Sequence, residues 1–90
     1  TGLVFEDTKT HIKTEYFTNN VFVAIGQVPH NEIFSELVDL EKGFILVDDN
    51  MMTKTPGLYA VGDCRKKGVR QLVTACNDGA IAALSAVKNL

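Results

Sequence analysis

Residues 70–90 carry the feature that most constrains the fold, a helical repeat of apolar and small side chains. Its apolar positions recur every three or four residues, at Leu72, Cys76, Ala80, Ala83, Val87 and Leu90. We expect a helix of about 20 residues, or about 30 Å. Asn77-Asp78-Gly79 is a turn signal inside this repeat. Either the helix breaks there, or Gly79 leaves room for an element that packs too closely for a side chain.

Short strand-forming runs precede the helix. Residues 3–5 and 11–17 flank the polar turn 7–10, and this pattern predicts a hairpin. The continuous apolar run 21–25 is typical of a central strand. The three strands together would form a meander.

A break in regular structure follows the meander. The segment 28–31 interrupts any strand or helix, and Asn31 is a candidate cap for a helical turn over 32–37. Two further strands are expected at 44–47 and 58–61. The break is the candidate boundary between two structural units.

The composition is that of a globular protein, with 46% hydrophobic and 22% charged residues. The net charge of -2 gives no overall electrostatic case for binding nucleic acid or an anionic membrane. No apolar run approaches the length that spans a bilayer, about 18 to 20 residues, and the N-terminus lacks a secretory signal. We therefore expect a cytoplasmic protein. Cys64 and Cys76 form no CxxC or metal-ligand pattern, so we expect two inert thiols and no metal site.

Gly62-Asp63 follows the expected strand 58–61 and is a candidate ligand contact. Open α/β sheets bind ligands at the carboxyl ends of their strands, where Asp63 can accept hydrogen bonds from sugar or polyol hydroxyls. Aspartate is also among the commonest turn residues, so Asp63 can equally be the start of a turn.

Four cations precede the expected helix, at Arg65, Lys66, Lys67 and Arg70. The positive end of the helix dipole disfavours each by about 0.3–1 kcal/mol, and a phosphate-bearing ligand would relieve that conflict. The alternative is a solvated basic loop. The first helical amides, near Gln71 and Leu72, are free to bind an anionic or electron-rich atom, or only water. No catalytic triad or carboxylate pair is visible, so no catalytic residue is predicted.

Three longer segments combine these features: VFVAIGQVPHNEIF at 21–34, GFILVDDNMMTKTPGLYAVGDC at 43–64 and RQLVTACNDGAIAALSAV at 70–87. Together they resemble the C-terminal portion of the low-molecular-weight, bacterial-type thioredoxin reductases of the pyridine nucleotide-disulfide oxidoreductase family. The resemblance implies an α/β fold, namely a fragment of a Rossmann-like FAD/NAD(P)-binding fold with a β-meander, further β-strands and a long C-terminal helix. Residues 1–42 would be the C-terminal end of the pyridine-nucleotide-binding domain, and residues 43–90 the C-terminal half of the FAD-binding domain.

The resemblance also assigns cofactor-binding roles, to Gly62, Asp63, Arg70, Gln71 and Leu72. Asp63 would bind flavin-side hydroxyls near the pyrophosphate, and Arg70-Gln71-Leu72 would start a helix that faces the isoalloxazine ring. The implied reaction passes a hydride from NADPH to FAD, reduces an enzyme disulfide, and then reduces thioredoxin or a similar disulfide protein. The resemblance further implies a homodimer and an unbroken final helix, in which Gly79 permits close packing.

The chain contains no GxGxxG loop and no CxxC, which lie upstream in the family. We therefore expect a C-terminal fragment that neither holds FAD tightly nor turns over alone. Its strand edges would lack neighbours, so we expect it to self-associate if it folds alone. Two other functions remain open. One is a flavoprotein reductase of an alkyl hydroperoxide or ferredoxin-linked system on the same scaffold, and the other is a non-catalytic module that binds a nucleotide or a protein.

Overall fold

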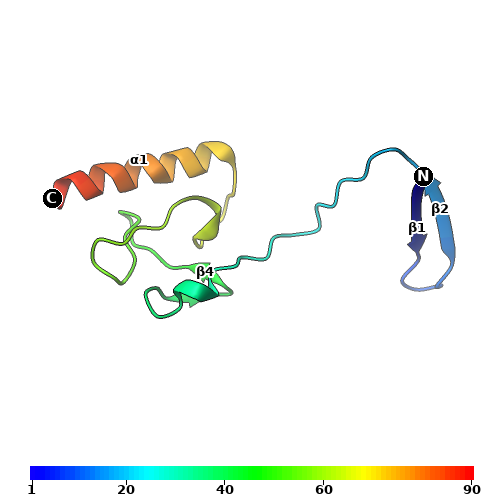
Figure 1. Cartoon of the computed structure of the whole chain (residues 1–90), viewed down its shortest axis with the longest axis horizontal. Coiled ribbons are helices and arrows are strands. Elements are labelled where there is room, and N and C mark those ends of the chain that lie inside the picture. The colour runs from blue at the N-terminus through cyan, green and yellow to red at the C-terminus, as the bar shows by residue number, and fades with distance from the viewer.

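The structure is a computed structural model that describes residues 1–90, and it measures 60 × 26 × 20 Å along its principal axes. A hairpin lies at the N-terminal end and a larger body at the C-terminal end, and an irregular segment joins them (Figure 1). All nine buried residues belong to this C-terminal body, between Asn31 and Ser85. The body is therefore the part of the chain in which a site can be shielded from water.

The hairpin consists of β1 (Gly2–Glu6) and β2 (Lys13–Phe17), which pair antiparallel along their whole length. Asp7 fixes the turn, because its carboxylate accepts the amides of Thr10 and Lys9 at 2.8 Å each. These backbone hydrogen bonds lower the pKa of Asp7. The predicted hairpin and its polar turn are confirmed.

The expected third strand of the meander does not form. Residues 21–25 belong to no strand, and the side chains of Phe22 and Ile25 are both 94% exposed. An apolar run of this kind is stable as a strand only where neighbours pair its backbone and cover its side chains. Neither the hairpin nor the body lies beside it (Figure 1), so the predicted meander is reduced to the two-stranded hairpin.

Short elements build the C-terminal body. The 3-10 turn η1 (Glu32–Phe34) precedes β3 (Leu40–Glu41) and β4 (Phe44–Ile45), which pair antiparallel. The expected strand 44–47 is thus shortened to β4. The expected strand 58–61 is reduced to a single antiparallel bridge, in which Tyr59 pairs with Met52.

A small apolar core lies under these elements. Its buried members are Val38, Ile45 and Ala60, and the partly buried residues packed against them are Leu40, Val47, Leu58 and Cys64. Burial of one large aliphatic side chain stabilises a fold by about 1.5–3 kcal/mol, whereas ordering each residue costs about 1–2 kcal/mol of backbone entropy. A core of this size offsets the ordering of only a few residues, so polar contacts weigh heavily in this body.

The long helix α1 (Leu72–Lys88) is unbroken across the Asn-Asp-Gly triplet, as predicted. The expected close packing at Gly79 is wrong within this chain, because a Cβ there would meet no heavy atom within 4 Å. The apolar face is also uncovered, with Leu72 83% exposed, and the buried positions of α1 are Asp78 and Ser85. The body therefore packs against a polar and small-residue side of α1. None of the helices combines the length and the apolar character that crossing a membrane requires.

Candidate functional site

A short turn after the Tyr59 bridge carries the first candidate ligand contact. This turn is the 3-10 element η2 (Gly62–Cys64), and it leaves Asp63 exposed. Gly62 is buried and has φ +78°, a left-handed conformation that glycine adopts without strain. A Cβ at Gly62 would lie 3.7 Å from the Cβ of Ala75, so the turn packs directly against α1. Asp63 is thus held at the surface beside the first turns of the helix.

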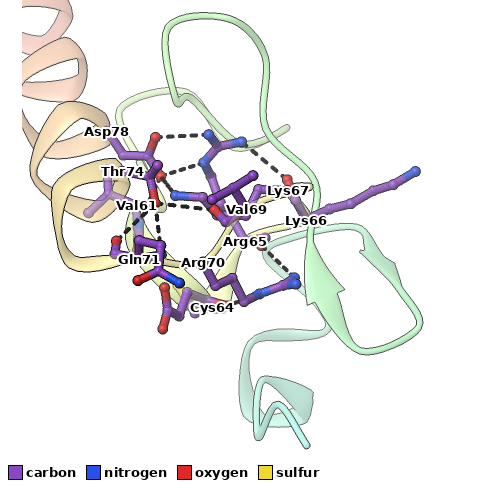
Figure 2. Close-up of polar contacts among 12 residues, drawn as sticks. Val61, Cys64, Arg65, Lys66, Lys67, Val69, Arg70, Gln71, Thr74 and Asp78 are labelled. Carbon is purple, nitrogen blue, oxygen red and sulfur yellow. Dashed lines mark hydrogen bonds and ion pairs between the residues drawn. The ribbon is translucent and has the colours of Figure 1, made fainter. Parts of the chain in front are cut away.

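One buried carboxylate joins this turn to α1. Asp78 is 1% exposed, and its Oδ2 accepts the Gly62 amide at 3.0 Å. Arg65 donates to both carboxylate oxygens, from Nε at 2.7 Å and from Nη2 at 2.8 Å, and Lys67 Nζ donates at 2.7 Å (Figure 2). The Arg65 guanidinium, with help from Lys67 and the Gly62 amide, holds the pKa of Asp78 well below its usual range. We call these four residues the Asp78 cluster.

The Asp78 cluster changes the interpretation of the basic loop. The sequence leaves open whether the cations face a phosphate-bearing ligand or only solvent. Arg65 and Lys67 instead bind an anion of the chain itself, so neither alternative describes them. Sequence reasoning missed Asp78 as a partner because it treated the residue only as part of a turn signal. The usable signal was that Asp78 is the only acidic residue after Asp63, in a stretch with four nearby cations.

The remaining two cations also have partners. Lys66 forms an ion pair with Glu41, and the hydrogen bond from Lys66 lowers the pKa of Glu41. Arg70 Nε donates to the main-chain oxygen of Asp63 at 3.1 Å, and Arg70 Nη2 donates to a second carbonyl of the same loop at 3.2 Å. The guanidinium also lies 3.8 Å from the ring centre of Phe44, in a cation–π contact. Arg70 therefore connects the Asp63 turn to the following loop and to Phe44.

The start of α1 presents free backbone donors. The Gln71 amide donates to Thr74 Oγ1 at 3.0 Å, and the same hydroxyl lies 3.1 and 2.9 Å from the main-chain oxygens of Val69 and Gln71 (Figure 2). The amides of Leu72 and Val73 have no acceptor within the chain. The helix start therefore offers two unsatisfied N–H groups with the positive end of the helix dipole behind them.

An open pocket of about 340 Å³ lies beside the Asp63 turn, lined by residues 27–31, Phe44, Asp63 and Cys64. Asn31 is buried, and its Nδ2 donates to the main-chain oxygens of Gly43 and Cys64 at 2.9 Å each. The expected role of Asn31 as a helix cap is wrong, because its side chain makes no capping hydrogen bond to η1. Asn31 instead ties the end of the connecting segment to the Asp63 turn, a long-range contact that no local pattern signals.

The cysteines take no part in a visible redox or metal site. Cys64 is half-buried and its Sγ donates to the main-chain oxygen of Val61 at 3.3 Å, whereas Cys76 is exposed on α1, and both are free thiols. No three His, Cys, Asp or Glu side chains lie together in a way that holds a metal ion.

The structure brings the predicted contacts to one corner of the body. Gly62 and Asp63 form the turn, and Arg70 binds it directly. Gln71 and Leu72 lie at the helix start that follows Arg70. Arg70 therefore links the Gly62-Asp63 turn to the start of α1 at Gln71 and Leu72.

The chain matches the family model described as pyridine nucleotide-disulphide oxidoreductase over residues 3–79. A thioredoxin reductase of Peptoclostridium acidaminophilum is 46% identical over 92 residues, which cover 94% of this chain and 29% of that protein. A 34.2 kDa protein in the rubredoxin operon of Clostridium pasteurianum is also 46% identical, over 87 residues that cover 96% of this chain and 28% of that protein.

A solved structure supports the same assignment. The crystal structure of Lactococcus lactis thioredoxin reductase, in its FR conformation, matches with a TM-score of 0.75 and 43% identity, covering 97% of this chain and 29% of that one. The chain therefore spans less than a third of the length of these relatives. The α/β order of strands followed by a C-terminal helix and the Rossmann-like fold class are confirmed. The chain belongs to the pyridine nucleotide-disulphide oxidoreductase family.

Proposed function

We propose that the chain is the C-terminal part of an FAD- and NAD(P)H-dependent thioredoxin-disulfide reductase. In this proposal residues 1–42 end the pyridine-nucleotide-binding domain, and residues 43–90 complete the FAD-binding domain. The parent protein would be a cytoplasmic homodimer with a redox-active disulfide. The observation that carries the proposal is the free Asp63 carboxylate beside the open start of α1, in a chain with this family membership.

The groups at this surface fit a flavin in chemical type. The exposed Asp63 carboxylate accepts no hydrogen bond within the chain, so both of its oxygens are available to ligand hydroxyls. Arg70 uses two of its nitrogens on main-chain oxygens and keeps further N–H groups free. The free amides at Leu72 and Val73 suit an electron-rich ring edge.

FAD, when bound, would supply the two-electron chemistry that links NADPH to a disulfide. The residues of this chain would orient it. Asp63 would fix the hydroxyl-bearing part, and Gly62 would let the backbone of the turn lie close to it. The start of α1, with Arg70, Gln71 and Leu72, would stabilise negative charge on the ring.

The disulfide chemistry would lie outside these residues. Cys64 and Cys76 are free and belong to no CxxC, so neither is assigned a redox role. The chain also contains no glycine-rich loop for a pyrophosphate. We therefore expect the 90-residue chain alone to bind FAD weakly and to show no reductase turnover.

The test uses the complete protein that carries this chain. We expect it to purify with bound flavin and to reduce thioredoxin with NADPH. Asp63→Ala should weaken FAD binding at least about tenfold, or about 1.4 kcal/mol. Asp49→Ala is the matched control, because Asp49 is also an exposed aspartate but lies in another loop. Equal flavin affinity in the two variants would show that Asp63 does not bind the flavin. A complete protein that purifies without flavin would refute the proposal.

A second candidate is a flavoprotein reductase that serves a different acceptor, such as an alkyl hydroperoxide or ferredoxin-linked system. It is favoured by one observation, the equal identity to the protein named for its place in a rubredoxin operon. NADPH and NADH oxidation measured with thioredoxin, rubredoxin or ferredoxin as acceptor distinguishes these reductases. A flavin-loaded protein that turns over with none of them would instead support a non-catalytic nucleotide- or protein-binding module.

A further inference from the structure

We propose that Asp78 is the positioning residue of this site, because its carboxylate holds the Asp63 turn on α1 and keeps Arg65 and Lys67 away from the ligand. The proposal rests on the proposed function, since it concerns the same flavin-binding surface. Asp78 would not touch the flavin. It would act through Gly62, Arg65 and Lys67.

The first argument is geometric. The Gly62 amide, which donates to Asp78 Oδ2 at 3.0 Å, immediately precedes Asp63 in the chain. Asp78 lies on α1, the same helix whose start provides the free amides of Leu72 and Val73. The two halves of the proposed flavin surface are therefore linked by one carboxylate. Because Asp78 is 1% exposed, water does not readily replace this link.

The second argument concerns charge. Arg65 and Lys67 are largely buried beside Asp78, with side chains 18% and 6% exposed. If they were unpaired, both cations would compete with Arg70 for a flavin pyrophosphate and draw it away from the Asp63 carboxylate. Asp78 occupies Arg65 through two donors and Lys67 through its ammonium group. Arg70, which donates to the main-chain oxygen of Asp63, is then the cation of this loop that has no carboxylate partner. The Asp78 carboxylate thereby determines which cation is available to bind the flavin pyrophosphate.

The decisive variant is Asp78→Asn in the complete protein, because asparagine keeps the shape and removes the charge. One amide oxygen cannot accept all the donors that the carboxylate accepts, so the Gly62 contact competes with Arg65 and Lys67. We expect FAD to bind at least about tenfold more weakly, which corresponds to about 1.4 kcal/mol. The flavin titration is done well below the melting temperature of each variant, so that lost stability alone does not change the affinity.

A second measurement follows the turn itself. Hydrogen exchange of the amides of residues 62–64 should become faster in Asp78→Asn, with or without flavin, because the Gly62 donor loses its anchor. Glu41→Gln is the matched control. It removes the carboxylate partner of Lys66 in the same basic loop, but at an exposed position where Glu41 is 47% accessible. We expect both the flavin affinity and the exchange of residues 62–64 to stay unchanged in Glu41→Gln.

The possible results distinguish a failure of the positioning role of Asp78 from a failure of the proposed function. If Asp78→Asn does not fold, the charge-balanced double variant Lys67→Met/Asp78→Asn replaces it and should show the same loss of flavin affinity. Unchanged flavin affinity with unchanged exchange would overturn the positioning role. Tighter flavin binding would also overturn it, since the freed cations would then be ligand groups. A wild-type protein that binds no flavin refutes the proposed function, and the exchange measurement still decides whether Asp78 holds the turn.

Discussion

Gly62 shows how a single backbone angle controls the candidate site. Its φ of +78° is strained for any residue with a Cβ. We expect Gly62→Ala to destabilise the protein by about 1–2 kcal/mol, the usual cost of a left-handed conformation. The new methyl would lie 3.7 Å from Ala75, an ordinary contact, so backbone strain and not a clash causes the loss.

Urea unfolding measures the effect, with Gly68→Ala as the control. Gly68 has no left-handed φ, and a Cβ there would meet no heavy atom within 4 Å. We expect this control to be neutral or slightly stabilising, because alanine restricts the unfolded chain. If the two variants lost equal stability, the strain at Gly62 would not be the cause.

The Asp78 carboxylate should make the free energy of unfolding depend on pH. Its folded-state pKa lies below the unfolded value of about 3.9, so the carboxylate binds its proton more weakly in the folded protein. The stabilisation is therefore fully present above about pH 5 and is lost as the pH falls below about 4. Breaking a buried ion pair by removing one partner costs about 3–5 kcal/mol, and we expect that range for Asp78→Asn at neutral pH.

The measurement is the difference in unfolding free energy between wild type and Asp78→Asn over a series of pH values. The difference should be constant at neutral and mildly acidic pH and should shrink in strong acid, where the wild-type carboxyl also becomes neutral. A difference that grows as the pH falls would have the wrong sign and would contradict the ion-pair account. The NMR titration of the Asp78 carboxyl carbon, compared with the same carbon in the urea-unfolded chain, gives an independent check.

At the scale of elements, α1 shows what a periodic pattern can and cannot predict. The repeat located the helix to within two residues at either end, because hydrogen bonds inside the helix depend on nearby residues alone. The repeat did not identify the buried face. Leu72 is exposed and Asp78 is buried, because burial depends on which element packs against the helix. Local patterns likewise predicted the hairpin and the polar turn at Asp7. They left open whether the Asp63 turn and the helix start bind a ligand, and the resemblance assigned cofactor-binding roles to five residues there.

The contacts that hold the candidate site together were not predictable from local patterns. Asp78 lies 16 residues from Gly62, and Asn31 lies 33 residues from Cys64. Local propensity carries no information on such pairs. Strands were overpredicted for a related reason, since the runs at 44–47 and 58–61 need sheet neighbours that the body does not provide.

Asn31 gives the element-scale prediction. Its side chain joins the end of the connecting segment to the turn before β4 and to η2, through the main-chain oxygens of Gly43 and Cys64. Asn31→Ala leaves these two oxygens without their donor in a partly buried place, so we expect a loss of about 1–3 kcal/mol. Asn19→Ala is the control, because Asn19 is exposed and lies outside every helix and strand. Thermal unfolding of both variants measures this loss of stability. Equal melting temperatures would mean that the Asn31 hydrogen bonds do not stabilise the fold.

At the scale of the whole molecule, exposed apolar surface is the dominant feature. Only four apolar residues are buried, whereas the segment 21–25 exposes most of its aliphatic and aromatic surface. Unpaired backbone with apolar side chains is a ready template for strand pairing between chains. We therefore expect the 90-residue chain to self-associate in solution, chiefly through this segment.

Sedimentation velocity over a range of concentrations tests this expectation. The wild-type chain should shift from monomer to larger species as the concentration rises. The double variant Phe22→Ser/Ile25→Ser should shift less, because both side chains are 94% exposed and contribute no folded contact that the substitution would remove. Asn19→Ser, next to the same segment and already polar, should behave as wild type.

A wild-type chain that stays monomeric at high concentration would show that its exposed apolar surface does not drive self-association. If the double variant associated as strongly as wild type, the contact would lie elsewhere, and the uncovered apolar face of α1 would be the next surface to change.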